Sequence, residues 1–240
     1  MIRSIALNLD CMPFMKGLSD NYFDLAIADP PYGLGMGSPS LKNRFVKQKN
    51  GNKLPITQSD YGKKDWDATT PNQEFFDELR RISKNQIIFG ANYFGLSGGM
   101  IVWDKLNGKS DQFGCEIIYT SFNKRTDMVY YMWNGMMQGS YCGVDIKMAL
   151  IQKGNKKLNE KRIHPTQKPV MLYQYLFGKF CKTGDLVFDP MMGSQSSRLA
   201  AYSIGLEYIG CELDHDYYID GITRFKDEIG ENEYNKLQLL

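Results

Sequence analysis

Short apolar runs bounded by polar or turn-forming residues recur along the chain. Phe23 to Ala28 is such a run: it is too short for a helix and is followed directly by Asp29, as in a buried strand of a parallel sheet. Runs of the same kind predict further strands at Gln86 to Gly90, Met100 to Trp103, Glu116 to Phe122, Met128 to Trp133, Leu186 to Phe188 and Tyr208 to Cys211.

Helical periodicity appears between these runs. Asn72 to Ser83 repeats apolar residues at helical spacing, follows Pro71 and carries Glu74 early, which are signals of a helix start. The same reasoning predicts helices at Val170 to Phe180, at Ser196 to Ile204 and, with a charged face, from Tyr217 onward. Strands that alternate with helices at these lengths predict an α/β sheet with helices on both faces.

Two segments, Gly33 to Lys64 and Asn134 to Ile163, show little periodicity. Long irregular segments in a compact domain are usually functional or disordered. Both are basic: seven Lys or Arg against one acid lie between Leu41 and Lys64, and six against one between Lys153 and Lys168. Glu207 to Glu233 reverses this with nine acids and two bases, although the net charge is only +2. A face that binds a polyanion has such a layout, and so do solvated surface loops.

Length and composition narrow the class of protein. With 240 residues, 42% of them hydrophobic, the chain fits a single packed domain over residues 1–240. No apolar run approaches the roughly 20 residues that span a bilayer, and Asp10 interrupts an N-terminus without a signal-peptide pattern, so we expect a cytoplasmic protein. Five cysteines without a CxxC pair and two histidines predict no metal site.

The tetrapeptide Asp29-Pro30-Pro31-Tyr32 carries the candidate chemistry. An exocyclic base amine is a poor nucleophile, and the Asp29 carboxylate and Pro30 carbonyl can accept its two hydrogens as it attacks. Pro31 holds Pro30 extended, and Tyr32 offers a ring face to a base swung out of a duplex. The tetrapeptide follows a predicted parallel strand, where α/β sheets bind ligands. Taken alone, it is equally a turn built from strong turn formers.

Several further stretches make the chain similar to a known family. LAIADPPYG, RIHPTQKPVMLYQYL, LVFDPMMGSQSSRLAA and YIGCELD resemble, in this order, motifs of the DNA N6-adenine and N4-cytosine methyltransferases. The order matches the subgroup whose catalytic half precedes its cofactor-binding half. NQIIFGANYF and GGMIVWDK resemble the strands that flank the catalytic one, mostly scaffold. The resemblance implies a Rossmann-like, mixed seven-stranded sheet with permuted motif order, and S-adenosylmethionine as cofactor.

The resemblance also implies a set of site residues. Asp29, Pro30, Pro31 and Tyr32 correspond to the family's catalytic motif. Glu212 ends a strand where the family uses an acid to hold the ribose hydroxyls, which a carboxylate suits because it only accepts hydrogen bonds. The cofactor-binding residues implied by matching position are Asp10, His164, Thr166, Gln167, Lys168, Asp189, Gly193, Ser194 and Glu212. Without the family, Asp10 is equally a helix cap, HPTQKP a capped loop and Glu212 a solvated acid.

The cofactor loop departs from the family pattern, which is close to DPFxGSGT. Met191 replaces the usual Phe, and Gln195 replaces the second Gly. A tight-turn position has therefore lost the residue that most easily adopts φ > 0. This departure bears on the path of the loop and on its affinity for the cofactor.

The function implied is site-specific methylation of adenine N6 in double-stranded DNA by base flipping, as in restriction-modification systems. N4-cytosine methylation is the nearest alternative, although members of that branch more often have Ser in place of Asp29. A noncatalytic DNA-binding relative is a second alternative, and methylation of RNA or a protein glutamine is more remote. Residues 33–64 and 134–163 are the expected DNA-contact segments. Their shortness leaves simple recognition and recognition shared across a homodimer both open.

Overall fold

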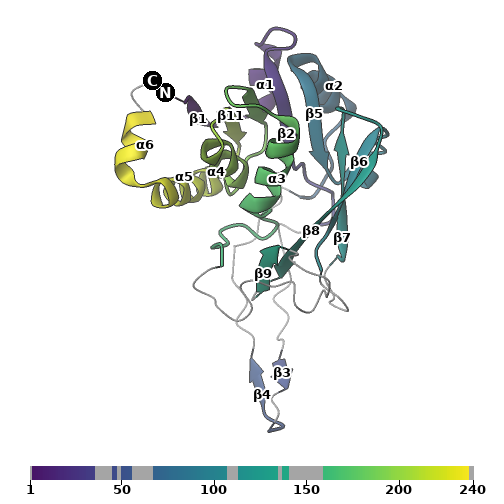
Figure 1. Ribbon diagram of the computed structural model, residues 1–240, viewed down its shortest axis with the longest axis vertical. Helices are drawn as coiled ribbons and strands as arrows, with labels where there is room; N and C mark the ends of the chain where they lie inside the picture. Colours follow the sequence, from purple (N-terminus) through teal and green to yellow (C-terminus); the bar gives the residue numbers. More distant parts are fainter. Residues whose placement is uncertain are drawn as a thin grey trace.

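A mixed β-sheet forms the centre of the computed structural model, which describes residues 2–35, 45–47, 50–55, 67–106, 113–134, 137–140 and 159–237 (Figure 1). Within this part of the chain, nine strands join in the order β1-β11-β10-β2-β5-β7-β6-β8-β9. Their bounds are β1 Ser4–Asn8, β2 Phe23–Ala28, β5 Ser83–Phe89, β6 Gly99–Asp104, β7 Cys115–Thr120, β8 Thr126–Asn134, β9 Met137–Ser140, β10 Leu186–Asp189 and β11 Glu207–Glu212.

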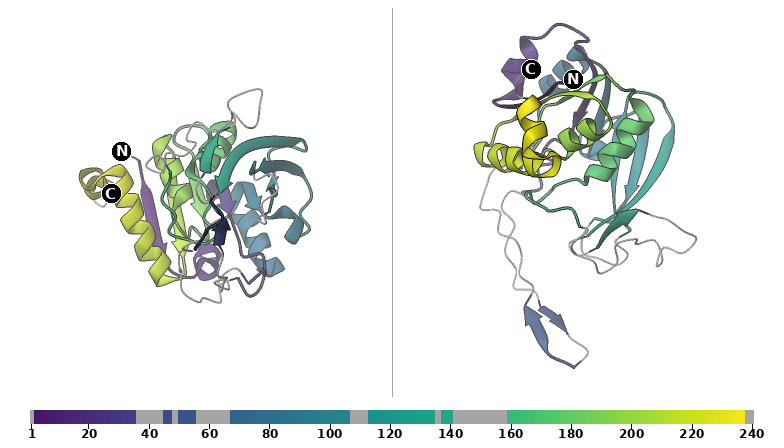
Figure 2. Two further views of the ribbon diagram at one scale, coloured as in Figure 1. Left: turned by 90° about the horizontal axis from the view of Figure 1, so that it is seen from below. Right: turned by 60° about the vertical axis from the view of Figure 1, so that its left-hand side comes forward.

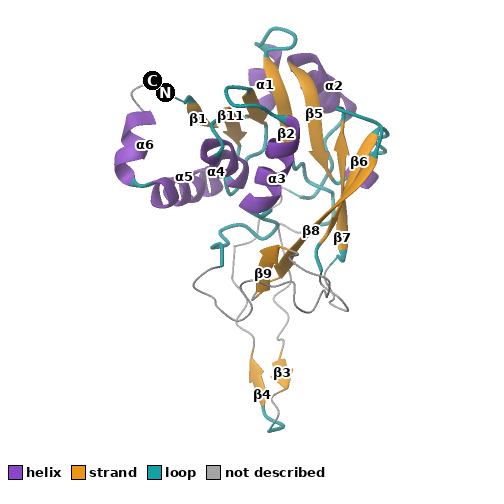
Figure 3. Ribbon diagram, in the orientation of Figure 1, coloured by secondary structure: helices purple, strands orange, loops and turns teal. Residues whose placement is uncertain are grey.

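Helices cover both faces of this sheet (Figures 2 and 3). They are α1 Cys11–Lys16, α2 Gln73–Ile82, the 3-10 turn η1 Ala91–Tyr93, α3 Val170–Phe180, α4 Ser196–Ser203, α5 His215–Ile229 and α6 Glu231–Leu237. Alternate residues of β2 divide between two cores, since Leu25 and Ile27 pack with α3 and α4 whereas Ala26 and Ala28 pack with α1 and α2. The prediction of an α/β sheet covered on both faces is therefore confirmed.

The sheet has nine strands in the described residues where seven were expected. β1 was not predicted; it is an edge strand whose short apolar stretch, Ile5 to Leu7, stays at least partly exposed, and only its Ser4 is buried. β9 lies at the opposite edge, inside the segment read as irregular, and its buried Gln138 is polar. A short antiparallel hairpin, β3 (Phe45–Lys47) with β4 (Lys53–Pro55), was also not predicted. The rest of the two basic segments falls largely outside the described residues.

Capping residues set the first residue of two helices, α2 and α5. Asn72 accepts a hydrogen bond from the Phe75 amide at 3.1 Å and begins α2 where the sequence predicted it. Asp214 accepts from the amides of Asp216 and Tyr217, at 3.0 and 3.1 Å, so α5 starts at His215, two residues before the predicted Tyr217. The cap, and not the apolar pattern, sets that boundary.

The strands β1, β11, β10, β2 and β5 run parallel, so their carboxyl ends meet at one edge of the sheet. The chain leaves β2 toward β5 and leaves β10 toward β11, in opposite directions. The β10/β2 boundary is thus a topological switch point, where open α/β sheets bind ligands. Of the helices described, none is long and apolar enough to cross a membrane. No three His, Cys, Asp or Glu residues cluster as metal ligands within the described chain.

Candidate active site

A cavity of about 430 Å³ opens at this carboxyl edge. Its lining brings together residues that are far apart in the sequence but were expected to share a site. Those are Asp10, Asp29, Pro31, His164, Thr166, Gln167, Lys168, Gly193, Ser194 and Glu212. Among the described residues that line it, Pro30, Tyr32 and Asp189 do not appear, although they were also expected at the site.

Asp29 lies directly after β2 with its side chain 18% exposed. Both carboxylate oxygens accept hydrogen bonds from Lys168 Nζ, at 2.9 and 2.8 Å, and Oδ1 also accepts from the Tyr32 hydroxyl at 2.8 Å. Burial raises the pKa of Asp29, and the attraction of Lys168 offsets only part of this rise. Burial works against the charge of Lys168 as well, but Asp29 and Glu116 outweigh it and raise the pKa of Lys168.

A second carboxylate, Glu116 on β7, lies beside this ion pair. Its Oε2 is 3.3 Å from Lys168 Nζ and 3.4 Å from the oxygen of the Tyr32 hydroxyl, while its Oε1 pairs with Lys105. Burial alone would raise the pKa of Glu116, but Lys168 and Lys105 hold it below its ordinary value. We call Asp29, Glu116, Lys105, Lys168 and Tyr32 the acid–lysine cluster. It contains two carboxylates and two ammonium groups, so its charges balance.

Most of this cluster could not be recognised from the sequence. Lys105 ends the GGMIVWDK stretch, which was read as scaffold, and Glu116 looks like an ordinary polar position in a strand. Lys168 was expected at the cofactor and lies against Asp29 instead, although it also lines the cavity. The signal that could have pointed to the cluster is a charged residue within or directly after an apolar strand. Lys105 and Glu116 have side chains only 12% exposed, and buried charges in proteins are paired.

Tyr32 packs against η1 and is not among the described residues that line the cavity. The ring stacks on Tyr93 of η1 with centroids 4.7 Å apart and an interplanar angle of 15°. It also lies over Gly90, which adopts φ +71° and where a Cβ atom would come within 2.8 Å of Tyr32 Cζ. The use of Tyr32 as a stacking platform for a base stays a prediction, since one face of the ring is already packed.

Gln167 holds its own segment together. Its Oε1 accepts from the Ile163 amide at 2.9 Å, and its Nε2 donates to Glu160 Oε1 and to the Lys161 carbonyl, both at 2.9 Å. The side-chain amide therefore has its oxygen and both hydrogens engaged within residues 160–167. Contact with a cofactor through this side chain stays a prediction; the structure shows it shaping the loop that lines the cavity.

His164 and Thr166 face the cavity from the same loop. The His164 ring packs edge-on against Tyr217 of α5 at 4.2 Å, and its Nδ1 lies 3.2 Å from the Thr166 hydroxyl. Glu160 fixes the far end of the loop, because its Oε2 accepts from the Val170 amide at the start of α3, at 2.9 Å, and its Oε1 pairs with Arg224.

Asp189, at the end of β10, lies behind the cofactor loop. It is 2% exposed, and it accepts from the Met191 amide at 3.0 Å and from the Ser197 hydroxyl at 2.6 Å. Burial raises the pKa of Asp189 to about 7, against the opposing effect of these hydrogen bonds. The geometry gives Asp189 a part in holding the loop, and its direct contact with a cofactor stays a prediction.

The loop keeps a tight turn although Gln195 replaces glycine. Gln195 adopts the left-handed conformation, φ 59° and ψ 26°, directly before α4. Its side chain is completely buried, accepts from Arg198 at 2.9 Å and donates to the Tyr218 carbonyl at 3.4 Å. These bonds direct the side chain into the protein and away from the cavity, so the departure from the family pattern leaves the cavity side of the loop open.

Glu212 closes the other side of the cavity. Its oxygens accept from the amides of Gly193 and Asp214, both at 2.8 Å. Each carboxylate oxygen can accept a further hydrogen bond, so Glu212 can still bind a diol. Asp10 caps α1 by accepting from the Met12 amide at 2.9 Å, which confirms the capping alternative and leaves the side chain exposed at the cavity. Apolar side chains that sequence reasoning missed also line the cavity: Leu9, Cys11, Tyr173, Met191, Met192 and Tyr217.

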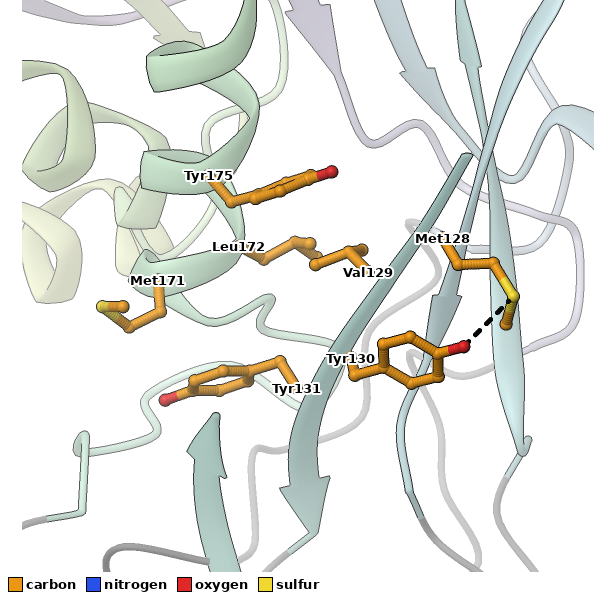
Figure 4. A pocket seen from close by; sticks show the side chains of 7 residues that line it. All are labelled: Met128, Val129, Tyr130, Tyr131, Met171, Leu172 and Tyr175. Carbon is orange, nitrogen blue, oxygen red and sulfur yellow. Dashed lines mark hydrogen bonds between the residues drawn. The ribbon is translucent and has the colours of Figure 1, made fainter. Parts of the chain in front are cut away.

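A second cavity, of about 330 Å³, lies between β8 and α3 (Figure 4). Val129 and Tyr131 point from β8 toward Leu172 of α3, and alternate residues of the strand point to its other side. The residues that line it in the described part of the chain include no Asp, Glu, Lys, Arg or His. The polar side chains of this lining are the phenols of Tyr130, Tyr131 and Tyr175, which provide no pair of opposite charges such as the first cavity has.

Comparison with known proteins gives concordant results. A family model described as DNA methylase, of the N6/N4 type, matches residues 100–222, just over half of the chain. The type II methyltransferase M2.DpnII of Streptococcus pneumoniae is 25% identical over 97% of this chain and 92% of its own length. M2.MboI of Moraxella bovis is 25% identical over 87% and 82%.

Solved structures share the fold. The PvuII DNA methyltransferase, described as cytosine-N4-specific, superposes with a TM-score of 0.53 at 13% identity, over 98% of this chain and 94% of that one. TTHA0409 of Thermus thermophilus, described as a putative DNA modification methylase in complex with S-adenosyl-L-methionine, gives a TM-score of 0.50 at 17% identity, over 95% and 96%.

Proposed function

The chain belongs to the N6/N4 family of DNA methylases, and on that premise we propose that it methylates adenine N6 in double-stranded DNA. The observation that carries the proposal is the position of Asp29. Its carboxylate lines the same cavity as Glu212 and Gly193, directly after a parallel strand at the switch point of the sheet. An acceptor for the target amine and a site for the methyl donor thus share one cavity.

The residues of the cavity fit S-adenosylmethionine. A volume of about 430 Å³ falls in the ordinary range for ligand sites. Glu212 would hold the ribose hydroxyls, Leu9, Met191 and Tyr217 the adenine ring, and the loop of His164 the methionine end. When bound, S-adenosylmethionine supplies an electrophilic methyl group on a positively charged sulfur.

Asp29 and Pro30 act on the base. The Asp29 carboxylate accepts one hydrogen of the target amine and the Pro30 carbonyl accepts the other, which lets the nitrogen become tetrahedral and frees its lone pair. Asp29 then removes the proton that the methylated nitrogen must lose. Lys168 keeps the carboxylate in place, since it bonds both oxygens. A base in a duplex is out of reach of this site, so the target adenine must be flipped out.

The decisive test combines activity with cofactor binding. Asp29→Ala should reduce methyl incorporation from labelled S-adenosylmethionine into unmethylated plasmid DNA by about 10²-fold or more, while calorimetry shows nearly unchanged cofactor affinity. Asp127→Ala, which removes an acid paired with Lys179 on the surface, is the matched control and should keep full activity. Methylation near the wild-type rate in Asp29→Ala would refute the mechanism.

The choice of adenine depends on Asp29, because relatives that methylate cytosine N4 more often have Ser there. Both bases present an exocyclic amine of the same geometry, so the fold is compatible with either. Sequencing that detects methylated bases in DNA from an expressing host returns the base and the recognition motif together. N4-methylcytosine in that DNA, without N6-methyladenine, would overturn the adenine assignment and leave the methylase assignment intact.

Double-stranded DNA is the proposed partner, and the two basic segments are the proposed contact surfaces. Their Lys and Arg side chains would position the duplex through its phosphates, a contribution that weakens steeply with salt. Recognition shared across a homodimer remains part of this proposal. Sedimentation of the protein with and without a duplex containing the identified motif tests it, and a monomer in both conditions would refute sharing.

A further inference from the structure

The carboxylate proposed to receive the target amine is already bonded. Both oxygens of Asp29 accept from Lys168 Nζ, at 2.9 and 2.8 Å, and Oδ1 also accepts from Tyr32. A carboxylate oxygen has two lone pairs, so Oδ1 has no further capacity and Oδ2 has one site left. Asp29 therefore offers the amine a single acceptor site, on Oδ2, of a carboxylate that already accepts three hydrogen bonds. A second site opens only if Lys168 yields part of its contact.

Lys168 cannot simply move into solvent. Its side chain is 5% exposed, and a buried ammonium without a counter-ion is costly. Glu116 offers a second acceptor at close range, because its Oε2 lies 3.3 Å from the same Nζ. Because the same Nζ lies close to both carboxylates, Lys168 can exchange one for the other without leaving the cluster.

We propose that Glu116 is a positioning residue for methyl transfer, which takes over the ammonium group of Lys168 when the target amine bonds to Asp29. The proposal rests on the role of Asp29 in the proposed function. No proton or electron changes hands in this exchange; one hydrogen bond of Lys168 passes from Asp29 to Glu116. Asp29 thereby gains a second free acceptor site for the amine.

The remaining members of the acid–lysine cluster are arranged to support this exchange. Lys105 pairs with Glu116 Oε1 and leaves Oε2 facing Lys168. Tyr32 donates to Asp29 at 2.8 Å and its hydroxyl oxygen lies 3.4 Å from Glu116. Its hydrogen bond can therefore also pass from Asp29 to Glu116. Because the cluster carries two positive and two negative groups, Lys168 stays neutralised in either position.

The test compares Glu116→Gln, which removes the charge and keeps the shape, with Glu116→Asp, which keeps the charge. Single-turnover methyl incorporation into unmethylated plasmid DNA should fall about 10-fold in Glu116→Gln, and Glu116→Asp should recover most of the rate. The affinity for S-adenosylmethionine, measured by calorimetry, should stay unchanged in both, since Glu116 does not line the cofactor cavity in the described chain. A merely structural defect would lower affinity and rate together.

A double-mutant cycle shows whether Glu116 acts through Lys168. In the background of Lys168→Met there is no ammonium to receive, so adding Glu116→Gln should change the residual rate by less than about twofold. Wild-type rate in Glu116→Gln, or an undiminished loss in the Lys168→Met background, would overturn the proposal. If Lys168→Met does not fold, the comparison of Glu116→Gln with Glu116→Asp decides alone. If the Glu116 experiments fail while Asp29→Ala is inactive, only the role of Glu116 is refuted and the proposed function stands. An active Asp29→Ala variant refutes the proposed function itself.

Discussion

Gln195 packs directly on Gly221, 26 residues later in the chain: a Cβ atom at Gly221 would lie 2.7 Å from Gln195 Nε2 and 2.8 Å from its Cγ. Gly221 is in the middle of α5, where glycine weakens a helix by about 1 kcal/mol relative to alanine. A glycine is needed at position 221 because the buried side chain of Gln195 occupies the space that a methyl group would need. A substitution in the cofactor loop is thus matched by a small residue on a neighbouring helix.

We predict that Gly221→Ala destabilises the protein by about 1 to 3 kcal/mol, because the added methyl group overpacks Gln195. Gln195→Gly should restore much of this loss in the double variant, since it removes the clash and relaxes the left-handed backbone. Urea unfolding of both single variants and the double variant measures the coupling. Gly178→Ala in α3 is the control: with no atom within 4 Å of its Cβ position, it should leave stability unchanged or raise it. Additive effects of the two substitutions would contradict the pairing.

This pair also shows what the sequence could and could not predict. The apolar pattern predicted α3 at its observed bounds and placed Asp29 at a strand end. Comparison with the family motif identified Gln195 as a departure from the usual loop, but not where its side chain goes, because that depends on the packing of Gln195 against Gly221 of α5. Periodicity reports burial along one element, whereas such contacts arise only when elements pack.

The candidate site divides in the same way. The order of the motifs predicted that Asp10, Asp29, Gly193 and Glu212 share one site, and all four line the same cavity. The pairing of Lys168 with Asp29 was not predicted, since their separation of 139 residues carries no local signal. The edge strands and the buried ion pairs were not predicted for the same physical reason. Both are stabilised mainly by residues far away in the sequence, and the local pattern of apolar residues does not report such contacts.

Asp189 should make stability depend on pH. Its pKa in the folded chain, about 7, lies above the ordinary value of 3.8. Between these values the folded chain holds a proton that the unfolded chain has released, so stability falls as the pH rises from about 4 to about 7. Asp189→Asn removes this dependence, and its free energy of unfolding relative to wild type should therefore rise over that range, by a few kcal/mol at most.

The control for Asp189 is an acid with the opposite shift. Lys179 lowers the pKa of Asp127, so this carboxylate contributes stability above its unfolded pKa and loses it as the pH falls through the folded value. Asp127→Asn should accordingly lose stability relative to wild type as the pH rises through about 4. Urea titrations at several pH values measure both variants. Parallel curves for Asp189→Asn and wild type would show that Asp189 is ionised throughout.

Glu212 should contribute to cofactor affinity in two ways, by binding the ribose and by holding the Gly193 amide at 2.8 Å. Glu212→Gln keeps the length of the side chain but replaces one acceptor oxygen with a donor, which must then face an N–H group or a hydroxyl. We expect the affinity for S-adenosylmethionine to fall about 10-fold or more, as for the loss of a hydrogen bond to a charged group. Calorimetry at fixed pH measures it, and an unchanged dissociation constant would exclude the role.

Gly90 and Gly95 form a matched pair for testing Tyr32. Both have left-handed backbones, φ +71° and +62°, so an alanine at either costs about 1 to 2 kcal/mol in backbone strain. Only at Gly90 would the new methyl group meet a side chain, 2.8 Å from Tyr32 Cζ, whereas nothing lies within 4 Å at Gly95. Gly90→Ala should therefore push the Tyr32 ring from Tyr93 and its hydroxyl from Asp29.

Misplacement of about 1 Å at a reacting group can cost up to about 10²-fold in rate, so we expect Gly90→Ala to lose at least about 10-fold in methyl transfer. Its affinity for S-adenosylmethionine should stay near wild type, because Tyr32 is not among the described residues that line the cavity. Gly95→Ala should show a similar loss of thermal stability with nearly full activity. Equal activity of the two variants would mean that the position of Tyr32 is irrelevant to the chemistry, and that its hydrogen bond to Asp29 serves only the fold.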